Sequence, residues 1–381
     1  MHPTIAMLNK KSQRGYTLVE LMIALALGLM LLGGLIQVFQ GSKKSYRFST
    51  ELSRMQENGR YALDLIAHDI RMIGYQGCAD PGEVVPNVIA DPPPANTASM
   101  SGLQAFKVTT GGIAPSGTFP ALYTDGTVTN HASTPQAFDI SAYALPYTDM
   151  IMMQFMNPTG IGLTKVKDPS TAQLTVVSNP LNFQSGDVII VSDCETADIF
   201  RCTGVANNAS GGINISHGSA NNSGSTAPML SKSYGDDAEV LRFETNLYFI
   251  APSGKDRDTA TTRTNTRGDT INSLYRVTIK NKVDELVQGV DAMVLLYGEE
   301  LSDGNIRYYS ANDSGLDITK VKSIKVSLLM HSIEAVSDEA DTTTYNVSGT
   351  NFASTGAPSY TSSDHRMRRV FSETVNLRNR R

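Results

Sequence analysis

An uninterrupted apolar segment near the N-terminus constrains this chain more than any other feature of its 381 residues. From Leu21 to Ile36 no side chain is polar, and a helix from Tyr16 to Phe39 would be about 36 Å long. The hydrocarbon core of a membrane is about 30 Å thick. The segment therefore predicts one membrane-spanning helix, whereas a mean hydropathy of −0.17 for the whole chain excludes a protein with many spans.

Basic residues flank the apolar segment on both sides, so charge alone leaves its orientation open. They are Lys10, Lys11 and Arg14 before the segment and Lys43, Lys44 and Arg47 after it. A secretory signal peptide would show small residues at a cleavage site just after its apolar run. Larger side chains follow Ile36, so we do not expect the segment to be removed.

Glu20 places an acidic side chain inside this expected membrane helix. A carboxylate there costs about 2.5–3.5 kcal/mol and usually marks a functional position. If the chain is cut between Gly15 and Tyr16, Glu20 becomes the fifth residue, and the new α-amine of a neighbouring copy can pair with it. Alternatively, Glu20 lies near the lipid headgroups at the helix N-terminus, where the helix dipole favours an acid.

Residues 14–21, which read RGYTLVEL, resemble the class III signal of type IV prepilins and type II secretion pseudopilins. The resemblance implies that a prepilin peptidase in the membrane cuts after Gly15 and methylates the new N-terminal residue, Tyr16. The family usually has Phe at that place, so Tyr16 is a mild aromatic departure. The specificity of the motif favours a role for Glu20 in assembly.

Further segments resemble the PilW family of minor pilins. They are residues 56–63, 71–75, 77–78, 186–188, 192–194, 197–200, 368–371 and 376–380. These segments spread over most of the chain, with divergent stretches between them. The resemblance implies a pilin-like architecture.

The residues after the apolar segment form an amphipathic pattern. Apolar or small residues recur at steps of three and four, at Leu52, Met55, Gly59, Ala62, Leu63, Ile66, Ile70 and Ile73. This spacing predicts one face of a helix. Since no proline lies between Pro3 and Pro81, we expect a single helix from about 17 to 73 whose apolar face packs on a sheet. The face around Glu51, Arg54 and Gly59 is expected to meet neighbouring pilin helices.

The rest of the chain reads as β-structure and loops. Expected strands are 103–109, 149–156, 173–178, 187–192, 239–250, 274–280, 290–297, 305–309, 321–333 and 366–377. Asp303-Gly304 predicts a hairpin turn. Segments 80–101, 207–237, 252–270 and 337–365 are polar and are expected to be loops. The predicted fold class is α+β, pilin-like, with a long N-terminal spine helix packed on an antiparallel sheet.

This pattern divides the chain into four expected parts. They are a leader peptide (1–15), the membrane-spanning half of the helix (16–39), its amphipathic half (40–75) and a β-rich globular head (76–381).

Three cysteines allow one disulfide in an oxidising compartment such as the periplasm. Cys194 and Cys202 are close in sequence and could form a short local loop. In PilW relatives a cysteine after the helix and one in an Asp-Cys element recur together, so the resemblance implies a Cys78–Cys194 bond. The Cys194–Cys202 pair and the absence of any disulfide are the alternatives.

The sequence gives no support for catalysis, a cofactor or a bound metal. Common hydrolase, nucleotide-binding and zinc-protease motifs are missing, and Asp303, Asp313 and Asp317 do not fit an EF-hand loop. Without the leader the 32 basic residues fall to 29 against 37 acidic ones, a net charge of −8 that argues against nucleic-acid binding. The arginines at 366, 368, 369, 378, 380 and 381 are read as a solvated face or as a docking edge for an acidic partner.

The predicted protein is a non-enzymatic minor pilin. Its expected partners are the prepilin peptidase, other minor pilins, the major pilin, a pilus-tip adhesin and the inner-membrane assembly platform. It would reside in the inner membrane with a periplasmic head and later in a surface pilus, where it would prime assembly near the tip and support twitching motility and adhesion. The alternatives are a type II secretion pseudopilin and a surface-binding tip adhesin.

Overall fold

A computed structural model describes most of the chain. The described residues are 15–79, 83–91, 93, 102–115, 128–129, 135–136, 140–164, 171–209, 211–223, 229–254, 262–278, 282–355, 357–360 and 364–379. The expected leader thus lies outside them except for Gly15. The chain divides into two units, Met1–Glu51 and Leu52–Arg381, and one helix contributes residues to both.

The helix α1 spans Leu18–Met72, which confirms the helix expected from the lack of proline and the apolar spacing. Its end is marked by Gly74, which adopts a left-handed conformation with φ +75°. Within the first unit the apolar side chains of α1 are exposed, for example Leu29 at 68% and Phe39 at 69%. This part of α1 is long and apolar enough to cross a membrane, with a mean hydropathy of 2.4 over its most apolar window.

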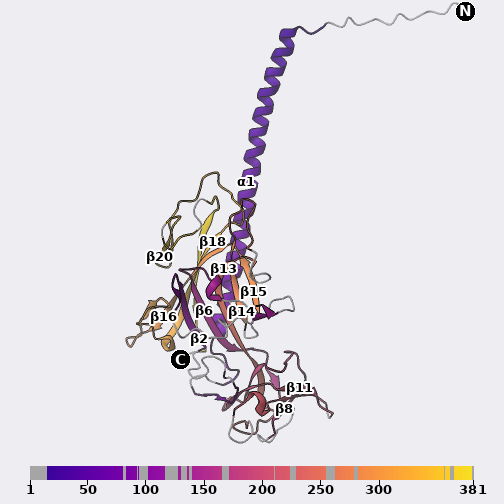
Figure 1. Cartoon of the computed structure of the whole chain (residues 1–381), viewed down its shortest axis with the longest axis vertical. Helices are drawn as coiled ribbons and strands as arrows, with labels where there is room; N and C mark the ends of the chain where they lie inside the picture. Colours follow the sequence, from indigo (N-terminus) through magenta and orange to yellow (C-terminus); the bar gives the residue numbers. More distant parts are fainter. Residues whose placement is uncertain are drawn as a thin grey trace, which may run out of the picture. The chain divides into compact units, whose positions relative to one another are not determined.

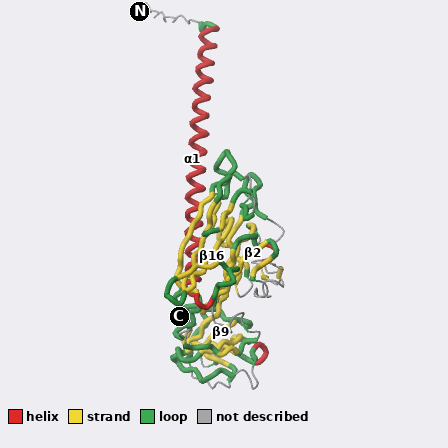
Figure 2. The backbone as a smooth tube through the Cα atoms, turned by 90° about the vertical axis from the view of Figure 1, so that its left-hand side faces the viewer, coloured by secondary structure: helices red, strands yellow, loops and turns green. Residues whose placement is uncertain are grey.

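In the second unit, α1 buries the apolar face that the sequence predicted. Ala62, Ile66, Ile70 and Ile73 are each 0% exposed and pack in one cluster with side chains from several strands. Figure 2 shows this part of the red helix running beside the yellow strands. The expectation that the amphipathic half of the helix packs on the sheet is therefore confirmed.

Gly59 corrects one part of that expectation, because it does not face a neighbouring helix. A Cβ atom at Gly59 would lie only 3.1 Å from the ring of Phe371. The position is therefore covered by the protein's own C-terminal strand, and glycine allows that strand to approach closely.

A buried carboxylate adds a polar link between α1 and the sheet. Asp69 accepts hydrogen bonds from Asn246 Nδ2 and from the hydroxyl of Tyr248, both at 2.7 Å. Burial and the adjacent Asp69 carboxylate raise the pKa of Tyr248 well above its usual value, so this hydroxyl stays a donor. The two bonds fix α1 in one register along the strand that carries Asn246 and Tyr248.

The largest sheet has ten strands, and β13 (Glu239–Pro252) is its central member (Figure 1). The main path is β1 (Asn87–Val88), β10 (Ala197–Arg201), β9 (Val188–Ser192), β13, β6 (Asp149–Met156), β2 (Leu103–Thr109) and β3 (Gly112–Ala114). Three strands lie off this path: β7 (Ile161–Gly162), β14 (Asn272–Thr278) and β15 (Val283–Gln288). The first half of β13 pairs with β9 and β7, and its second half pairs with β6 and β14.

A second sheet contains the C-terminal strand. Its order is β17 (Ile306–Tyr309), β16 (Val290–Glu300), β18 (Val321–His331) and β21 (Arg368–Asn376). A three-stranded sheet consists of β11 (Gly204–Asn207), β12 (Ile213–Ser216) and β8 (Gln173–Val176). Short elements complete the described fold: β4 (Val128–Thr129), β5 (Pro135–Gln136), α2 (Ile140–Tyr143), η2 (Ser219–Asn221), η3 (Ile318–Lys320), β19 (Tyr345–Val347) and β20 (Thr350–Phe352).

Every strand expected from the sequence is present within three residues of its predicted bounds. Asp303-Gly304 forms the expected turn between β16 and β17, with Gly304 at φ +80°. The sheet is not wholly antiparallel, because β1 and β10 pair in parallel. Three expected loops, 80–101, 207–237 and 337–365, also contain whole strands, because β1, β12, β19 and β20 are too short and too polar to stand out by composition.

We expect Ile66→Ala to lower the free energy of unfolding of a fragment lacking residues 1–42 by about 2–5 kcal/mol, because the side chain is removed from a closed core and leaves a cavity. Thermal unfolding followed by circular dichroism measures the change. Arg54→Ala, at an exposed position of the same helix, serves as the matched control. Equal melting temperatures for the wild-type fragment and Ile66→Ala would contradict the packing of α1 on the sheet.

Candidate functional site

The N-terminal motif begins with an accessible bond. Gly15 and Tyr16 precede α1 and belong to no helix or strand, and Tyr16 is 87% exposed. Among the described residues, none lies within 4 Å of the position that a Cβ atom of Gly15 would take. The predicted cleavage bond thus lies two residues before the first residue of α1, Leu18.

Glu20 and Thr17 together cap the N-terminus of α1. The Glu20 backbone N–H donates to Thr17 Oγ1 at 3.2 Å, and the Thr17 N–H donates to Glu20 Oε2 at 3.2 Å. The Thr17 hydroxyl also donates to Glu20 Oε2 at 3.3 Å. This is a capping box, in which two side chains satisfy N–H groups that the helix itself leaves unpaired.

The capping box identifies Thr17 as a residue that the sequence reasoning missed. Its signal was present, since a Thr followed three residues later by a Glu marks a helix start. A carboxylate can accept further hydrogen bonds, so the cap and a cationic partner do not compete for a single lone pair. The role of Glu20 in assembly stays a prediction, and within one chain Glu20 also caps α1.

The disulfide lies shortly after the C-terminal end of α1. Cys78 and Cys194 are bonded, with Cα atoms 4.8 Å apart, which is the pairing that the family resemblance implied. Cys194 lies in the turn between β9 and β10, where it adopts φ +73°. Cys202 is a free, buried thiol, and burial raises its pKa, so it remains protonated and unreactive.

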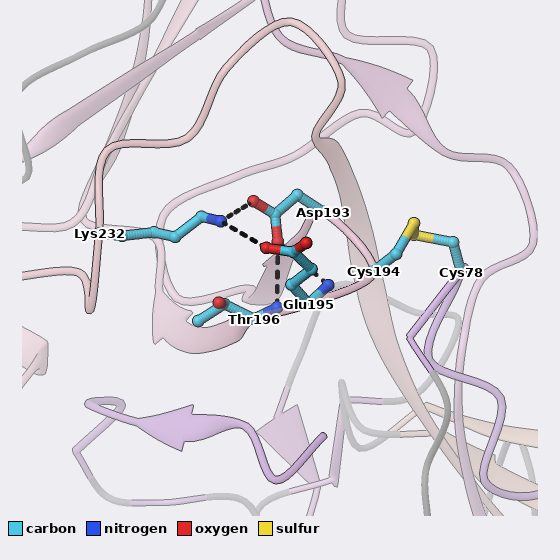
Figure 3. The surroundings of a disulfide bond; sticks show 6 residues. All are labelled: Cys78, Asp193, Cys194, Glu195, Thr196 and Lys232. Atoms are coloured by element: carbon cyan, nitrogen blue, oxygen red, sulfur yellow. Dashed lines mark hydrogen bonds and ion pairs between the residues drawn. A yellow bond between two sulfur atoms is a disulfide. The ribbon is translucent and has the colours of Figure 1, made fainter. Parts of the chain in front are cut away.

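The turn that carries Cys194 is held by its own polar contacts (Figure 3). Asp193 Oδ1 accepts hydrogen bonds from the N–H groups of Glu195 at 3.3 Å and Thr196 at 3.0 Å. Lys232 pairs with Asp193 and lies 4.0 Å from Glu195. The disulfide thus joins the end of α1 to a rigid turn of the ten-stranded sheet, across a sequence separation of 116 residues.

A network of buried charges fixes the start of β21, and it corrects the expectation for two of the C-terminal arginines. Arg366 and Arg368 are 1% and 5% exposed, so they form no solvated face. Arg368 binds Asp291 at 2.8 Å and Asp364 Oδ1 at 2.7 Å. Arg366 binds Asp364 at 2.8 Å through Nε and lies 3.2 Å from His331 Nδ1.

These arginines are buried because their acidic partners are buried with them, which offsets the cost of removing each charge from water. Arg369 and Arg378 are exposed, as expected, and Arg380 and Arg381 lie outside the described residues.

Burial alone would raise the pKa of Asp291, but His331, Arg368 and Arg366 hold that pKa well below its usual value. Burial lowers the pKa of His331 to about 4, so its imidazole is neutral near pH 7.

Comparison with known families finds two partial matches. A family model described as type IV pilus-assembly protein W matches residues 254–379, and a prokaryotic N-terminal methylation motif matches residues 10–36. The two matches cover less than half of the chain, and together they support a type IV pilus minor pilin. No curated protein matches it.

The PilW match covers the part of the head that contains β14 to β21 and the buried charge network. The methylation motif covers the capping box and the predicted cleavage bond. Neither match includes β6 to β12, which contain the Cys194 turn. Pilin domains are structural, and the described residues hold no group of three or more His, Cys, Asp or Glu that could bind a metal ion.

We expect non-reducing peptide mapping of the protein to recover Cys78 and Cys194 in one linked peptide pair. The reason is the short Cα separation together with the burial of Cys202. Cys202→Ser should leave this pair intact, whereas Cys78→Ser should release a free thiol at Cys194. Recovery of a Cys194–Cys202 peptide would overturn the assignment.

We expect the stability of the head to fall as the pH drops from about 6.5 to 4. An unfolded histidine takes up a proton near pH 6.5, but folded His331 resists protonation down to about 4, so protons favour the unfolded state in this window. His331 contributes at most about 1.4 kcal/mol per pH unit. Urea unfolding at several pH values should show a flatter profile for His331→Gln, whereas His68→Gln, at an exposed position, should keep the wild-type slope. An unchanged slope in His331→Gln would contradict the assignment.

Proposed function

We propose that this minor pilin joins other minor pilins in a complex that primes pilus assembly and stays near the pilus tip, where it supports twitching motility and adhesion. The observation that carries the proposal is the presence, in one chain, of a PilW-type head and an exposed apolar helix that starts at a capping box next to the Gly15–Tyr16 bond. A helix of this kind can leave a membrane only if similar apolar surfaces cover it elsewhere, and a bundle of pilin helices provides them.

The proposed life cycle has two stages. Before assembly, residues 16–39 span the inner membrane, the prepilin peptidase removes residues 1–15 and methylates Tyr16, and the head (76–381) lies in the periplasm. During assembly, the inner-membrane platform transfers the subunit into a filament with other minor pilins, the major pilin and a tip adhesin. The role is structural rather than enzymatic.

The main alternative, a type II secretion pseudopilin, shares the N-terminal motif but is disfavoured by the PilW match at residues 254–379. Deletion of the gene separates the two functions. Loss of surface pili and twitching with normal enzyme secretion supports the pilus role. Loss of secreted enzymes with normal pili would replace it with the secretion role.

We expect Glu20→Ala and Glu20→Gln to be cut and methylated at Tyr16 but to fail in assembly. Gln preserves the capping box because its amide oxygen can accept from the Thr17 N–H, yet it cannot form an ion pair with the α-amine of a neighbour. Mass spectrometry of the mature N-terminus and counts of surface pili measure the two outcomes. Glu20→Lys should assemble least, because it repels the amine.

Two results would contradict this prediction. Normal piliation in Glu20→Gln but not in Glu20→Ala would show that the cap alone matters. A mature protein that retains Met1 in cells with an active prepilin peptidase would refute processing, and with it the proposed function.

A further inference from the structure

Three exposed cations follow the apolar segment of α1. They are Lys43, Lys44 and Arg47, and no Asp or Glu occurs in residues 21–50. The next acid, Glu51, lies one helical turn beyond Arg47. Even when Glu51 is counted, three cations stand against one acid, so this part of the first unit has a net positive charge.

The three cations lie on one side of α1. With 3.6 residues per turn, Arg47 lies about 40° and Lys44 about 100° around the helix axis from Lys43. Phe39 and Tyr46 lie about 40° and 60° from Lys43 in the opposite direction, and they are 69% and 74% exposed. Lys, Arg and Tyr side chains next to an apolar helical segment are typical of the level of the lipid headgroups.

The position of the cations along α1 matches the thickness of a bilayer. The helix from Glu20 to Lys43 is about 35 Å long, and the hydrocarbon core of a membrane is about 30 Å thick. If Glu20 lies at one boundary of the hydrocarbon, the three cations therefore reach the headgroups at the other boundary. The exposed apolar side chains between them then remain in lipid.

Membrane topology does not account for these cations. Basic residues normally accumulate on the cytoplasmic side of a membrane span. In the proposed orientation that side carries Lys10, Lys11 and Arg14, which are removed with the leader, and residues 16–20 contain no basic side chain. The basic flank of the mature chain is then on the periplasmic side, so its cations call for an anionic partner there. Lipid phosphates lie at that level.

We infer that Lys43, Lys44 and Arg47 bind the headgroups of anionic phospholipids at the periplasmic surface of the inner membrane. This inference rests on the proposed function, which takes residues 16–39 to span that membrane with the head in the periplasm. Each Lys or Arg near an anionic surface contributes about 1 kcal/mol, which corresponds to about fivefold in affinity. The contact is lost when the subunit leaves the membrane, so it belongs to the unassembled subunit rather than to the filament.

Native mass spectrometry of the mature full-length protein tests the inference in the absence of any other pilin. The protein is placed in nanodiscs that contain equal amounts of phosphatidylglycerol and phosphatidylcholine with the same acyl chains. We expect the released protein to retain at least tenfold more phosphatidylglycerol than phosphatidylcholine. Each of Lys43→Gln, Lys44→Gln and Arg47→Gln should reduce this preference about fivefold, and the triple variant should retain both lipids equally.

A matched control removes the same charge from the head. Arg307, Lys320 and Arg369 are exposed in the second unit, and their combined substitution by Gln should keep the wild-type lipid preference. This control separates an effect at α1 from a general effect of net charge on the spectrum. A melting temperature equal to that of the wild type shows that each triple variant is folded.

Three results would overturn the inference. They are equal retention of the two lipids by the wild type, a preference that persists in the α1 triple variant, and an equal loss of preference in the head control. Equal retention by the wild type would point to an acidic side chain of another pilin as the partner of the cations.

The lipid experiment is independent of gene deletion, so the two failures can be told apart. If deletion removes pili and twitching while the lipid preference is absent, the inference fails and the proposed function stands. If deletion abolishes enzyme secretion instead while the preference is present, the proposed function fails and the lipid contact stands.

Discussion

The second unit depends on the burial of one face of α1. Ile66, Ile70 and Ile73 have no contact with water, and the strands that cover them come from both larger sheets. Burial of each such side chain contributes about 1.5–3 kcal/mol, so the helix is a large part of the core rather than an attachment to it. A helix this amphipathic gains little from propensity alone, and its stability comes from the sheet on which it packs.

Other stabilising interactions in the head join segments that are distant in sequence. The disulfide joins the end of α1 to the turn between β9 and β10, and Asp69 ties the last turns of α1 to β13. The buried arginines hold the start of β21 beside β16 and β18, so that Phe371 can pack over Gly59. Each of these interactions joins parts of the chain that are far apart in sequence.

Periodicity made α1 and the long strands predictable, because a repeat of 3.6 or 2 residues reports directly on which side chains face a core. The same reasoning failed for Arg366 and Arg368, since their acidic partners, Asp291 and Asp364, are brought to them only by the tertiary fold. At the N-terminus, the prediction that Glu20 is functional rests on the cost of a carboxylate inside an apolar helix and on the family resemblance. The spacing of Thr17 and Glu20 is sufficient to predict the cap from the sequence, whereas an intermolecular partner for the acid requires knowledge of the assembly.

The capping box helps to explain how the proposed assembly step would distinguish subunits without the leader from subunits that still carry it. Within one chain, Thr17 and the helix N-terminus stabilise the Glu20 carboxylate while it lies near water. In the interior of a filament that water is lost, and a carboxylate without a cation becomes costly. Only a neighbour cut at Gly15–Tyr16 offers an α-amine at that depth, because an uncut chain has a peptide bond there. The acid would therefore disfavour subunits that still carry the leader, since they would leave its charge buried without a partner.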